Sequence, residues 1–363
     1  MEILKNKGND RLYKVAIDIR PTKTKGNGIS KYTEEIMTRL KDGYLFLDGY
    51  YNIHNSIREK IFNKIWEQII LPFKIIGNKI EVFHCTKNMG LPIIKMCKYV
   101  VTIHDLIPMI FEQEYLNTPL KKFAYNRRIR QSINLADIII TDSKYSKQDI
   151  ITKFAIDESK IRVVYLGVDD KIFPVTDLDL IEQKKSKYKI EGDYILGIGS
   201  NEPRKNVKAL LEAYKRLKKN YQIEEKLVIM GKNWMEGTLD TSKDVIFTGY
   251  VDEKDLCAIY SGAKVFVYPS LYEGFGLPPL EAMACGTPVV TSNSTSIPEV
   301  VGDAAVLADP KDIQILEKSI IGLLQDSEYR NELRNKGFER VKRFKWEITV
   351  DELKKVYKEV IES

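Results

Sequence analysis

The chain has 363 residues, of which 44% are hydrophobic and 30% charged, and its formal net charge at pH 7 is +6. This length is enough for two domains of ordinary size, and the composition is typical of a globular protein in water. Lysine and arginine are mixed with aspartate and glutamate along the whole chain, which indicates a solvated surface and argues against a nucleic-acid-binding patch. A basic surface also suits contact with anionic lipid or polysaccharide.

Targeting and metal-binding signals are not evident in the sequence. The first residues lack the apolar segment of a signal peptide, and no apolar run is long enough to cross a bilayer. Three histidines are too few for a histidine-rich metal site. The four cysteines are scattered without a CxxC pair, at Cys85, Cys97, Cys257 and Cys285. We therefore expect a cytoplasmic protein with reduced thiols and no bound metal.

Strand-like and helix-like segments alternate through the first half of the chain. The predicted strands are residues 15–20, 82–84, 99–103, 138–141 and 161–165. The predicted helices are residues 29–40, 57–71, 119–134 and 144–154. Asp142 or Ser143 is the expected N-cap of the last of these helices. This alternation predicts a parallel sheet with helices on both faces.

The second half repeats the pattern. Its predicted strands are residues 194–198, 226–230, 245–248, 265–268 and 289–291. Its predicted helices are residues 207–217, 254–261 and 280–285. The predicted fold class is therefore α/β with two Rossmann-like domains, and the default ligand site is a cleft between the carboxyl ends of their sheets.

The two domains are predicted at residues 1–172 and 173–345. The boundary is placed near residues 169–189, where aspartate, lysine and Pro174 crowd together. The tail, residues 346–363, is predicted to form an amphipathic helix. Its apolar stripe consists of Leu353, Val356, Tyr357 and Val360.

A second apolar stripe recurs among the lysines and arginines of the predicted helix at 57–71. Its members are Ile61, Ile65, Trp66, Ile69 and Ile70. Contact with a membrane is one interpretation of this pattern. A helical apolar stripe normally faces a core, so we predict a core-facing helix of the first domain.

The most informative stretch is residues 269–288, which follow a predicted strand. Two prolines suit the first turn of a helix, and Gly286 is placed to end that helix in a left-handed conformation. Glu273 then lies on a loop and Glu281 in the helix. Backbone amides that favour anions surround the helix N-terminus, at Phe275, Gly276, Leu277 and Leu280. A phosphate cradle between two carboxylates suits a sugar nucleotide, whereas local chemistry alone equally allows a tight turn with two solvated glutamates.

A basic pair follows the first predicted strand of the second half. Arg204 and Lys205 lie after Gly199, between a strand and a helix, where two cations suit a diphosphate leaving group. Basic pairs in general are more often found in solvated loops. Glu202 occupies the place of a third glycine, which weakens a dinucleotide-binding interpretation.

Two features of the first half also end strands. Gly28 lies in a Gly-Asn-Gly segment that opens a helix, and an ordinary β-to-α turn is an equal alternative to a phosphate loop. His104 stands with Asp105 at the end of a predicted strand. A lone histidine is more often structural, yet this strand end faces the predicted ligand cleft. His84 also ends a strand and is a weaker candidate.

The sequence Glu-Gly-Phe-Gly-Leu-Pro-Pro-Leu-Glu-Ala-Met-Ala-Cys-Gly-Thr-Pro-Val-Val at 273–290 resembles the paired-glutamate signature of the retaining glycosyltransferases of family 4, which have the GT-B fold. The match continues through residues 296–305. The resemblance extends over nearly the whole chain and is strongest at residues 194–310. It implies a C-terminal helix that crosses back to the N-terminal, acceptor-side domain, with the nucleotide-sugar donor domain between them.

The resemblance also implies roles for the residues above. Glu273 would contact the transferred sugar and Glu281 the ribose hydroxyls, while His104 would contact sugar hydroxyls at the reacting centre. The catalytic residues are then His104 and Glu273. The donor-binding residues are Arg204, Lys205, Glu281, Phe275, Gly276, Leu277, Gly28 and Gly199.

The function implied is a retaining, metal-independent hexosyltransferase that needs no cofactor beyond its nucleoside-diphosphate sugar donor. Segments such as Glu-Pro-Arg-Lys-Asn at 202–206 are more similar to mannosyltransferase-like members, which favours GDP-mannose over UDP-hexose and dTDP-rhamnose. The expected acceptor is a hydroxyl of a glycan or a lipid-linked glycan in polysaccharide or cell-surface glycan synthesis, with peripheral membrane contact left open. The alternatives are a GT-B sugar-nucleotide epimerase and a non-catalytic binding protein.

Overall fold

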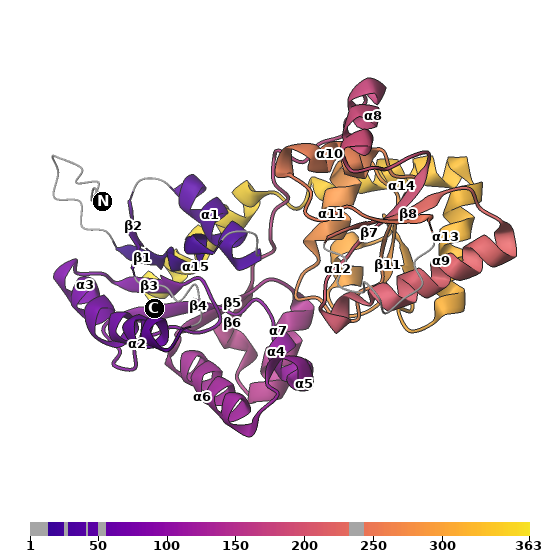
Figure 1. Ribbon diagram of the computed structural model, residues 1–363. Coiled ribbons are helices and arrows are strands. Elements are labelled where there is room, and N and C mark those ends of the chain that lie inside the picture. The colour runs from indigo at the N-terminus through magenta and orange to yellow at the C-terminus, as the bar shows by residue number, and fades with distance from the viewer. Residues whose placement is uncertain (1–13, 25–27, 41–42, 50–55, 232–242) are drawn as a thin grey trace. The chain divides into compact units, whose positions relative to one another are not determined.

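The computed structural model describes residues 14–24, 28–40, 43–49, 56–231 and 243–363 (Figure 1). The chain forms two compact units, one made of residues 1–165 and 346–363 and the other of residues 166–345. This division falls slightly before the predicted boundary between residues 172 and 173. Among the described residues, each unit is built on one six-stranded sheet in which all strand pairs are parallel.

The sheet of the first unit has the strand order β2-β1-β3-β4-β5-β6. Its strands are β1 (Val15–Asp18), β2 (Tyr44–Leu47), β3 (Val82–Cys85), β4 (Lys98–Thr102), β5 (Ile138–Thr141) and β6 (Ile161–Val163). Its helices are η1 (Arg20–Lys23), α1 (Gly28–Leu40), α2 (Ile57–Ile65), η2 (Trp66–Ile70), α3 (Leu71–Gly77), α4 (Ile107–Ile110), α5 (Glu112–Tyr115), α6 (Pro119–Leu135), α7 (Lys144–Phe154), η3 (Glu158–Lys160) and α15 (Trp346–Glu362). Helices separate the consecutive strands of this sheet except β3 and β4, between which none was predicted, so the predicted alternation is confirmed.

Both faces of this sheet are covered. The β-strand period of two sends Ala16, Phe83 and Val101 into a core shared with η2, α3, α6 and α7. On the opposite face, His84 hydrogen-bonds to Tyr357 of α15 (Nδ1 to Oη, 2.7 Å). The predicted apolar stripe of α15 is buried, and this last helix packs on α1 and β3 of the first unit.

The sheet of the second unit has the order β12-β11-β10-β7-β8-β9. Its strands are β7 (Tyr194–Ile198), β8 (Lys226–Met230), β9 (Val245–Phe247), β10 (Val265–Tyr268), β11 (Val289–Ser292) and β12 (Val306–Ala308). Its helices are α8 (Leu178–Lys187), η4 (Pro203–Lys205), α9 (Val207–Tyr221), α10 (Glu253–Ser261), α11 (Leu277–Ala284), α12 (Ile297–Val301), α13 (Ile313–Gln325) and α14 (Ser327–Val341). The strand order runs outward in both directions from the β7–β10 pair, which makes this pair the topological switch point of the sheet.

Helices cover both faces of the second sheet as well. Ile195, Val267 and Val290 belong to a core shared with α9 and α13. The alternate residues face α10, since the Tyr194 hydroxyl donates to the carbonyl of Ile259 (2.6 Å). The predictions missed the edge strands β2 and β12 and the helices α8 and α12–α14. The edge strands β6 and β9 are equally short and were predicted.

The predicted helix at 57–71 runs on to residue 77 through α2, the π-helical η2 and α3. The prediction that its apolar stripe faces the core is wrong for most of its members. Trp66 is buried, whereas Ile61, Ile65, Ile69 and Ile70 are exposed. The π-helical turn changes the angular spacing of side chains, and a buried ion-pair network holds Trp66 and Glu67 on the core side.

No helix among the described residues combines the length and the apolarity that crossing a membrane requires.

Candidate functional site

The carboxyl ends of β7 and β10 position a cluster of charged side chains in the second unit. The turn after β7 forms η4, and the loop after β10 hydrogen-bonds directly to it. The amide of Leu271 donates to the carbonyl oxygen of Arg204 (2.7 Å), and the hydroxyl oxygen of Ser270 lies 3.0 Å from the same carbonyl. The two loops are therefore fixed to each other at the switch point, where ligands bind in open α/β sheets.

Glu273 is the centre of this cluster. Its carboxylate lies 2.8 Å from Nη1 of Arg204 and 2.9 Å from Nζ of Lys205. It also accepts hydrogen bonds from the hydroxyls of Tyr268 and Ser270, both at 2.7 Å. Three predicted site residues thus meet in the fold, although 68 positions separate Lys205 from Glu273.

The cluster holds Glu273 in its ionised form. Burial alone raises the pKa of this carboxyl, but Lys205 and Arg204 outweigh burial and lower the pKa to about 2. Arg204 also pairs with Glu202 (Nε to Oε2, 2.7 Å). Each cation in the site is therefore already engaged with a carboxylate.

Helix α11 begins directly beyond this cluster, at Leu277, three residues before the predicted start at residue 280. Gly276 is its N-cap with φ of 109°, and prolines occupy its first turn. A Cβ at Gly276 would lie 2.5 Å from Cδ1 of Ile297, so this tight turn requires glycine. Phe275 is buried and its carbonyl accepts from the hydroxyl of Ser296 (2.8 Å), while Leu277 opens the helix. Gly286 ends the turn after α11 with φ of 76°, as expected.

Glu281 and Gly199 lie at two other points of the same unit. Glu281, on α11, accepts from the hydroxyl of Tyr260 (3.3 Å). The amide of Gly199 donates to the carbonyl of Met230 (2.6 Å), which ties the end of β7 to the end of β8. A Cβ at Gly231 would lie 2.3 Å from the carbonyl oxygen of Gly199, so the two backbones approach each other more closely than any side chain allows.

In the first unit, His104 follows β4 and is buried. Its Nδ1 lies 2.8 Å from Oδ2 of Asp142, and its Nε2 lies 3.1 Å from the carbonyl oxygen of Thr86. Because a carbonyl oxygen only accepts, Nε2 carries a proton. Both ring nitrogens are thus directed at protein groups, and neither is placed to take a proton from a ligand.

The pKa of His104 follows from the same contacts. Burial lowers this pKa, but the neighbouring carboxylate of Asp142 outweighs burial and the net shift is upward. Of the two predicted N-cap candidates of α7, Ser143 is the N-cap, and its hydroxyl accepts from the amide of Ser146 (3.0 Å). Asp142, the other N-cap candidate, contacts the ring of His104 instead.

We expect the His104→Gln substitution to remove a pH-dependent part of the stability of the first unit. A histidine whose pKa rises on folding stabilises the fold fully below its unfolded pKa of about 6.5 and loses this effect as the pH rises through its folded pKa. Thermal unfolding at a series of pH values should therefore show that the substitution lowers the melting temperature more in mildly acidic than in alkaline solution.

His84→Gln is the matched control, because burial lowers the pKa of His84 to about 3. The contribution of His84 to the free energy of unfolding has the opposite pH dependence. A histidine that is buried in its neutral form destabilises the fold as the pH falls below about 6.5. Parallel pH profiles for the two variants would contradict the opposite pKa shifts of the two histidines.

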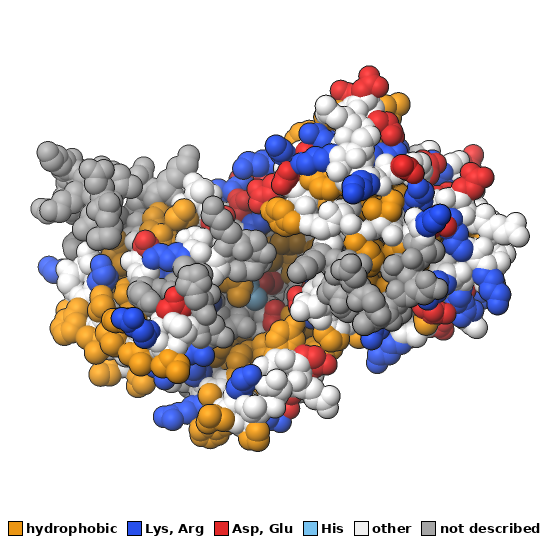
Figure 2. Space-filling view, in the orientation of Figure 1, with side chains coloured by type: hydrophobic (Ala, Val, Ile, Leu, Met, Phe, Trp, Pro, Cys, Tyr) orange, Lys and Arg blue, Asp and Glu red, His pale blue; other side chains and the backbone are white. Residues whose placement is uncertain are grey.

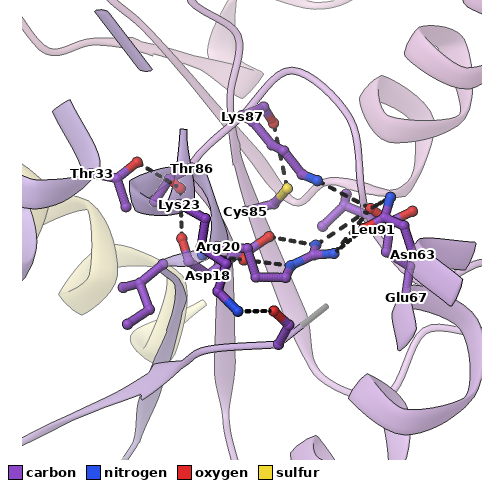
Figure 3. A network of polar contacts seen from close by, with 12 residues as sticks. Asp18, Arg20, Lys23, Thr33, Asn63, Glu67, Cys85, Thr86, Lys87 and Leu91 are labelled. Atoms are coloured by element: carbon purple, nitrogen blue, oxygen red, sulfur yellow. Dashed lines mark hydrogen bonds and ion pairs between the residues drawn. The ribbon is translucent and has the colours of Figure 1, made fainter. Parts of the chain in front are cut away.

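The switch point of the first sheet lies between β1 and β3, and a buried ion-pair network fills it. Figure 3 shows Arg20 between Asp18 and Glu67. The guanidinium binds Asp18 through Nε and Nη2, at 2.8 and 2.6 Å. Glu67 also accepts from Nζ of Lys87 (3.1 Å). Thr86 joins this network to His104, since its hydroxyl donates to the carbonyl of Asp18 (2.6 Å).

Gly28 is the first residue of α1, and a Cβ there would meet nothing within 4 Å. The rest of the predicted glycine loop, residues 25–27, lies outside the described residues. His84 is fully buried between Tyr357 and Thr102. It joins α15 to the sheet rather than facing a ligand.

Sequence reasoning did not select several residues that complete the site. Thr86 follows β3, Asp142 follows β5, and Ser270 follows β10. All three are polar residues just beyond the carboxyl end of a parallel strand. That position was the available signal, because the residue types alone do not separate them from ordinary turn residues.

Two family models and many known proteins match this chain. The model described as "Glycosyltransferase Family 4" matches residues 52–171, and "Glycosyl transferases group 1" matches residues 180–340. The Escherichia coli protein named O-antigen chain mannosyltransferase B is 36% identical over 269 residues, which cover 71% of this chain and 70% of the relative.

Solved structures share the fold at lower identity. Sucrose-phosphate synthase from Thermosynechococcus elongatus superposes with a TM-score of 0.74 at 19% identity, over 95% of this chain and 98% of the other. The Anabaena protein HepE in complex with UDP and glucose gives 0.71 at 17% identity, over 96% of this chain and all of the other (100%).

The two parallel sheets and these structural neighbours define a glycosyltransferase fold of the GT-B type. The chain belongs to glycosyltransferase family 4, in its mannosyltransferase-like group. The predicted family and fold class are thereby confirmed.

Proposed function

We propose that this glycosyltransferase transfers mannose from GDP-mannose, with retention of configuration, to a hydroxyl of a glycan or lipid-linked glycan. The observation that carries the proposal is the cluster of Arg204, Lys205 and Glu273 at the β7–β10 switch point. Two cations beside the N-terminus of α11 suit a diphosphate. The neighbouring carboxylate suits the hydroxyls of the sugar attached to it.

The cluster suggests how the donor is received. In the structure described here, Glu273 neutralises both cations. A diphosphate brings its own negative charge, so its oxygens replace those of Glu273 on Arg204 and Lys205. The released carboxylate then accepts hydrogen bonds from the sugar, while Glu281 accepts from the ribose hydroxyls.

The chemical step breaks the bond between the anomeric carbon and the diphosphate oxygen. The acceptor oxygen forms the new bond on the same face of the sugar, through an oxocarbenium-like state, and its proton passes to an oxygen of the departing diphosphate. Arg204, Lys205 and the α11 amides stabilise the charge on that leaving group. These groups supply the positive charge that a metal ion would otherwise provide, which makes metal-independent transfer part of the proposal.

His104 has a narrower role in this scheme. Nε2 of His104 donates to the carbonyl of Thr86 and Nδ1 lies against Asp142, so His104 holds Thr86 and the end of β4 in place and does not act as a general base. The mannose assignment draws support from the Escherichia coli relative, which is named as a mannosyltransferase of the O-antigen chain. An O-antigen-like polysaccharide made at the cytoplasmic face of a membrane is the corresponding acceptor.

Calorimetric titration with GDP, UDP, dTDP and ADP in the presence of EDTA tests the donor site. We expect GDP, and none of the other three nucleotides, to bind with micromolar affinity. Binding of UDP or dTDP instead would identify the donor as a UDP-sugar or a dTDP-sugar. Binding that requires a divalent metal would contradict metal independence.

Conversion of the sugar nucleotide without an acceptor would indicate an epimerase, and binding without transfer to any acceptor would indicate a non-catalytic protein. The anomeric configuration of the product, read by NMR, tests retention.

A further inference from the structure

One face of α2, η2 and α3 exposes an unusual number of large apolar side chains. We call it the apolar face, and in Figure 2 its side chains form the continuous hydrophobic area over α2 and α3. Its residues are between 38% and 77% exposed: Ile57, Ile61, Phe62, Ile65, Ile69, Ile70, Phe73, Ile76, Ile93 and Ile94. Scattered exposed apolar residues are normal, but a contiguous group of this size marks an interaction surface.

The apolar face is built into the fold. None of the nine residues of α2 is buried. The following turn is anchored by Trp66, which stacks under the Arg20 guanidinium at 4.1 Å, and by Glu67 in the buried network. The loop that carries Ile93 is held to the same turn, because its amide donates to Oε1 of Gln68 (2.8 Å). The core side of the segment is thus fixed, and its isoleucines and phenylalanines are held outward.

The charges around the apolar face have one predominant sign. Between residues 57 and 79 the exposed cations are Arg58, Lys60, Lys64, Lys74 and Lys79. The carboxylates of the same segment are Glu59 and Glu67, and Glu67 is buried against Arg20 and Lys87. A protein partner or a second copy of this positively charged face would need complementary carboxylates, which the face itself does not supply.

We propose that the apolar face docks on a membrane surface that contains anionic lipids. Isoleucine and phenylalanine side chains enter the boundary between headgroups and acyl chains, and the flanking lysines extend to the lipid phosphates. This surface corrects the sequence-based preference for a core-facing helix. The inference goes beyond the proposed transfer reaction and does not depend on the donor, because membrane binding is read without nucleotide.

Sedimentation of the full chain with lipid vesicles tests the proposal. One set of vesicles is phosphatidylcholine alone, and the other is phosphatidylcholine mixed with phosphatidylglycerol. We expect the chain to bind the anionic vesicles, with an affinity that falls as the salt concentration rises. The double variant Ile69→Ser/Phe73→Ser should lower the vesicle–water partition coefficient about 100-fold, at about 10-fold for each apolar side chain that would enter the membrane. Lys64→Gln/Lys74→Gln should lower it about 25-fold, at about 5-fold for each lysine.

Matched controls change exposed apolar residues and exposed lysines elsewhere. Phe173→Ser/Leu178→Ser removes a phenylalanine and a leucine that are 56% and 74% exposed in the second unit. Lys355→Gln/Lys358→Gln removes two exposed lysines from α15. Both should bind vesicles as the unchanged chain does, and thermal unfolding checks that all four variants fold.

Three results would overturn the proposal. The first is that the unchanged chain does not bind anionic vesicles. The second is that the control variants lose as much binding as the variants of the apolar face. Alternatively, light scattering would show a dimer that Ile69→Ser/Phe73→Ser dissociates, which would make the apolar face an interface between copies. Each result leaves nucleotide binding measurable in solution, so failure of the docking surface and failure of the donor site are distinguishable.

Discussion

Replacing Lys205 by Met is expected to lower the transfer rate by about 100-fold to 1,000-fold, as is replacing Arg204 by Gln. The reason is that each cation stabilises charge on the departing diphosphate inside a largely buried site, where a single well-placed donor has an effect of about this size. Steady-state rates and nucleotide titration measure the loss. Lys208→Gln, three residues further along and exposed, is the matched control and should transfer at the normal rate.

Removing a cation also leaves Glu273 buried without full compensation, so these variants should lose stability as well as activity. The double variant Lys205→Met/Glu273→Gln separates the two effects. It restores the charge balance, and we expect it to recover much of the stability of the second unit without recovering transfer. A normal transfer rate in the variant lacking both Arg204 and Lys205 would exclude them as the diphosphate-binding groups.

The second large effect is expected for Glu273→Gln, which should lower transfer by about 100-fold, because a neutral amide stabilises the developing positive charge on the sugar far less than a carboxylate does. The pKa of Glu273 is about 2, so the group stays ionised throughout the neutral range. The acid limb of the kcat/KM profile, which reports the donor-free enzyme, therefore belongs to another group, and Glu273→Gln should lower that profile without moving its acid limb.

The same carboxylate links stability to pH. Its pKa falls from 4.5 in the unfolded chain to about 2 in the folded one. This shift corresponds to about 3 kcal/mol in the free energy of unfolding. The depressed pKa means that this stabilisation is fully present above about pH 4.5 and is lost as the pH falls toward about 2. Chemical denaturation between these limits should show a flatter pH dependence for Glu273→Gln. An unchanged slope would mean that Glu273 is not held as an ionised partner of the two cations.

Most of the fold was predictable from the sequence, because parallel strands and amphipathic helices leave local patterns. The buried runs at β5, β7, β8 and β10 were placed at their observed bounds. The edge strands β2 and β12 were not predicted, although the three-residue edge strands β6 and β9 were. In the candidate site, the residue types after β7 and β10 predicted phosphate and sugar recognition.

The contacts within the site were not predictable in the same way. The local sequence pattern does not show which carboxylate meets Arg204 and Lys205, because that contact depends on β7 and β10 being neighbours in the sheet. The two hydrogen bonds of His104 depend equally on β3 and β5 lying on either side of β4. Sequence reasoning assigned His104 to sugar hydroxyls, whereas its ring nitrogens are occupied by Asp142 and Thr86.

By itself, the sequence determined the family, the two parallel α/β units and the charged residues that end their strands, since these depend on local periodicity and on residue types at fixed spacing. Only the tertiary structure decided which side of α2, η2 and α3 faces water. Periodicity shows that a helix has an apolar stripe, but the direction of that stripe depends on what packs against it. Here Arg20 and the buried network hold Trp66 and Glu67 inward, and the isoleucines are left on the surface.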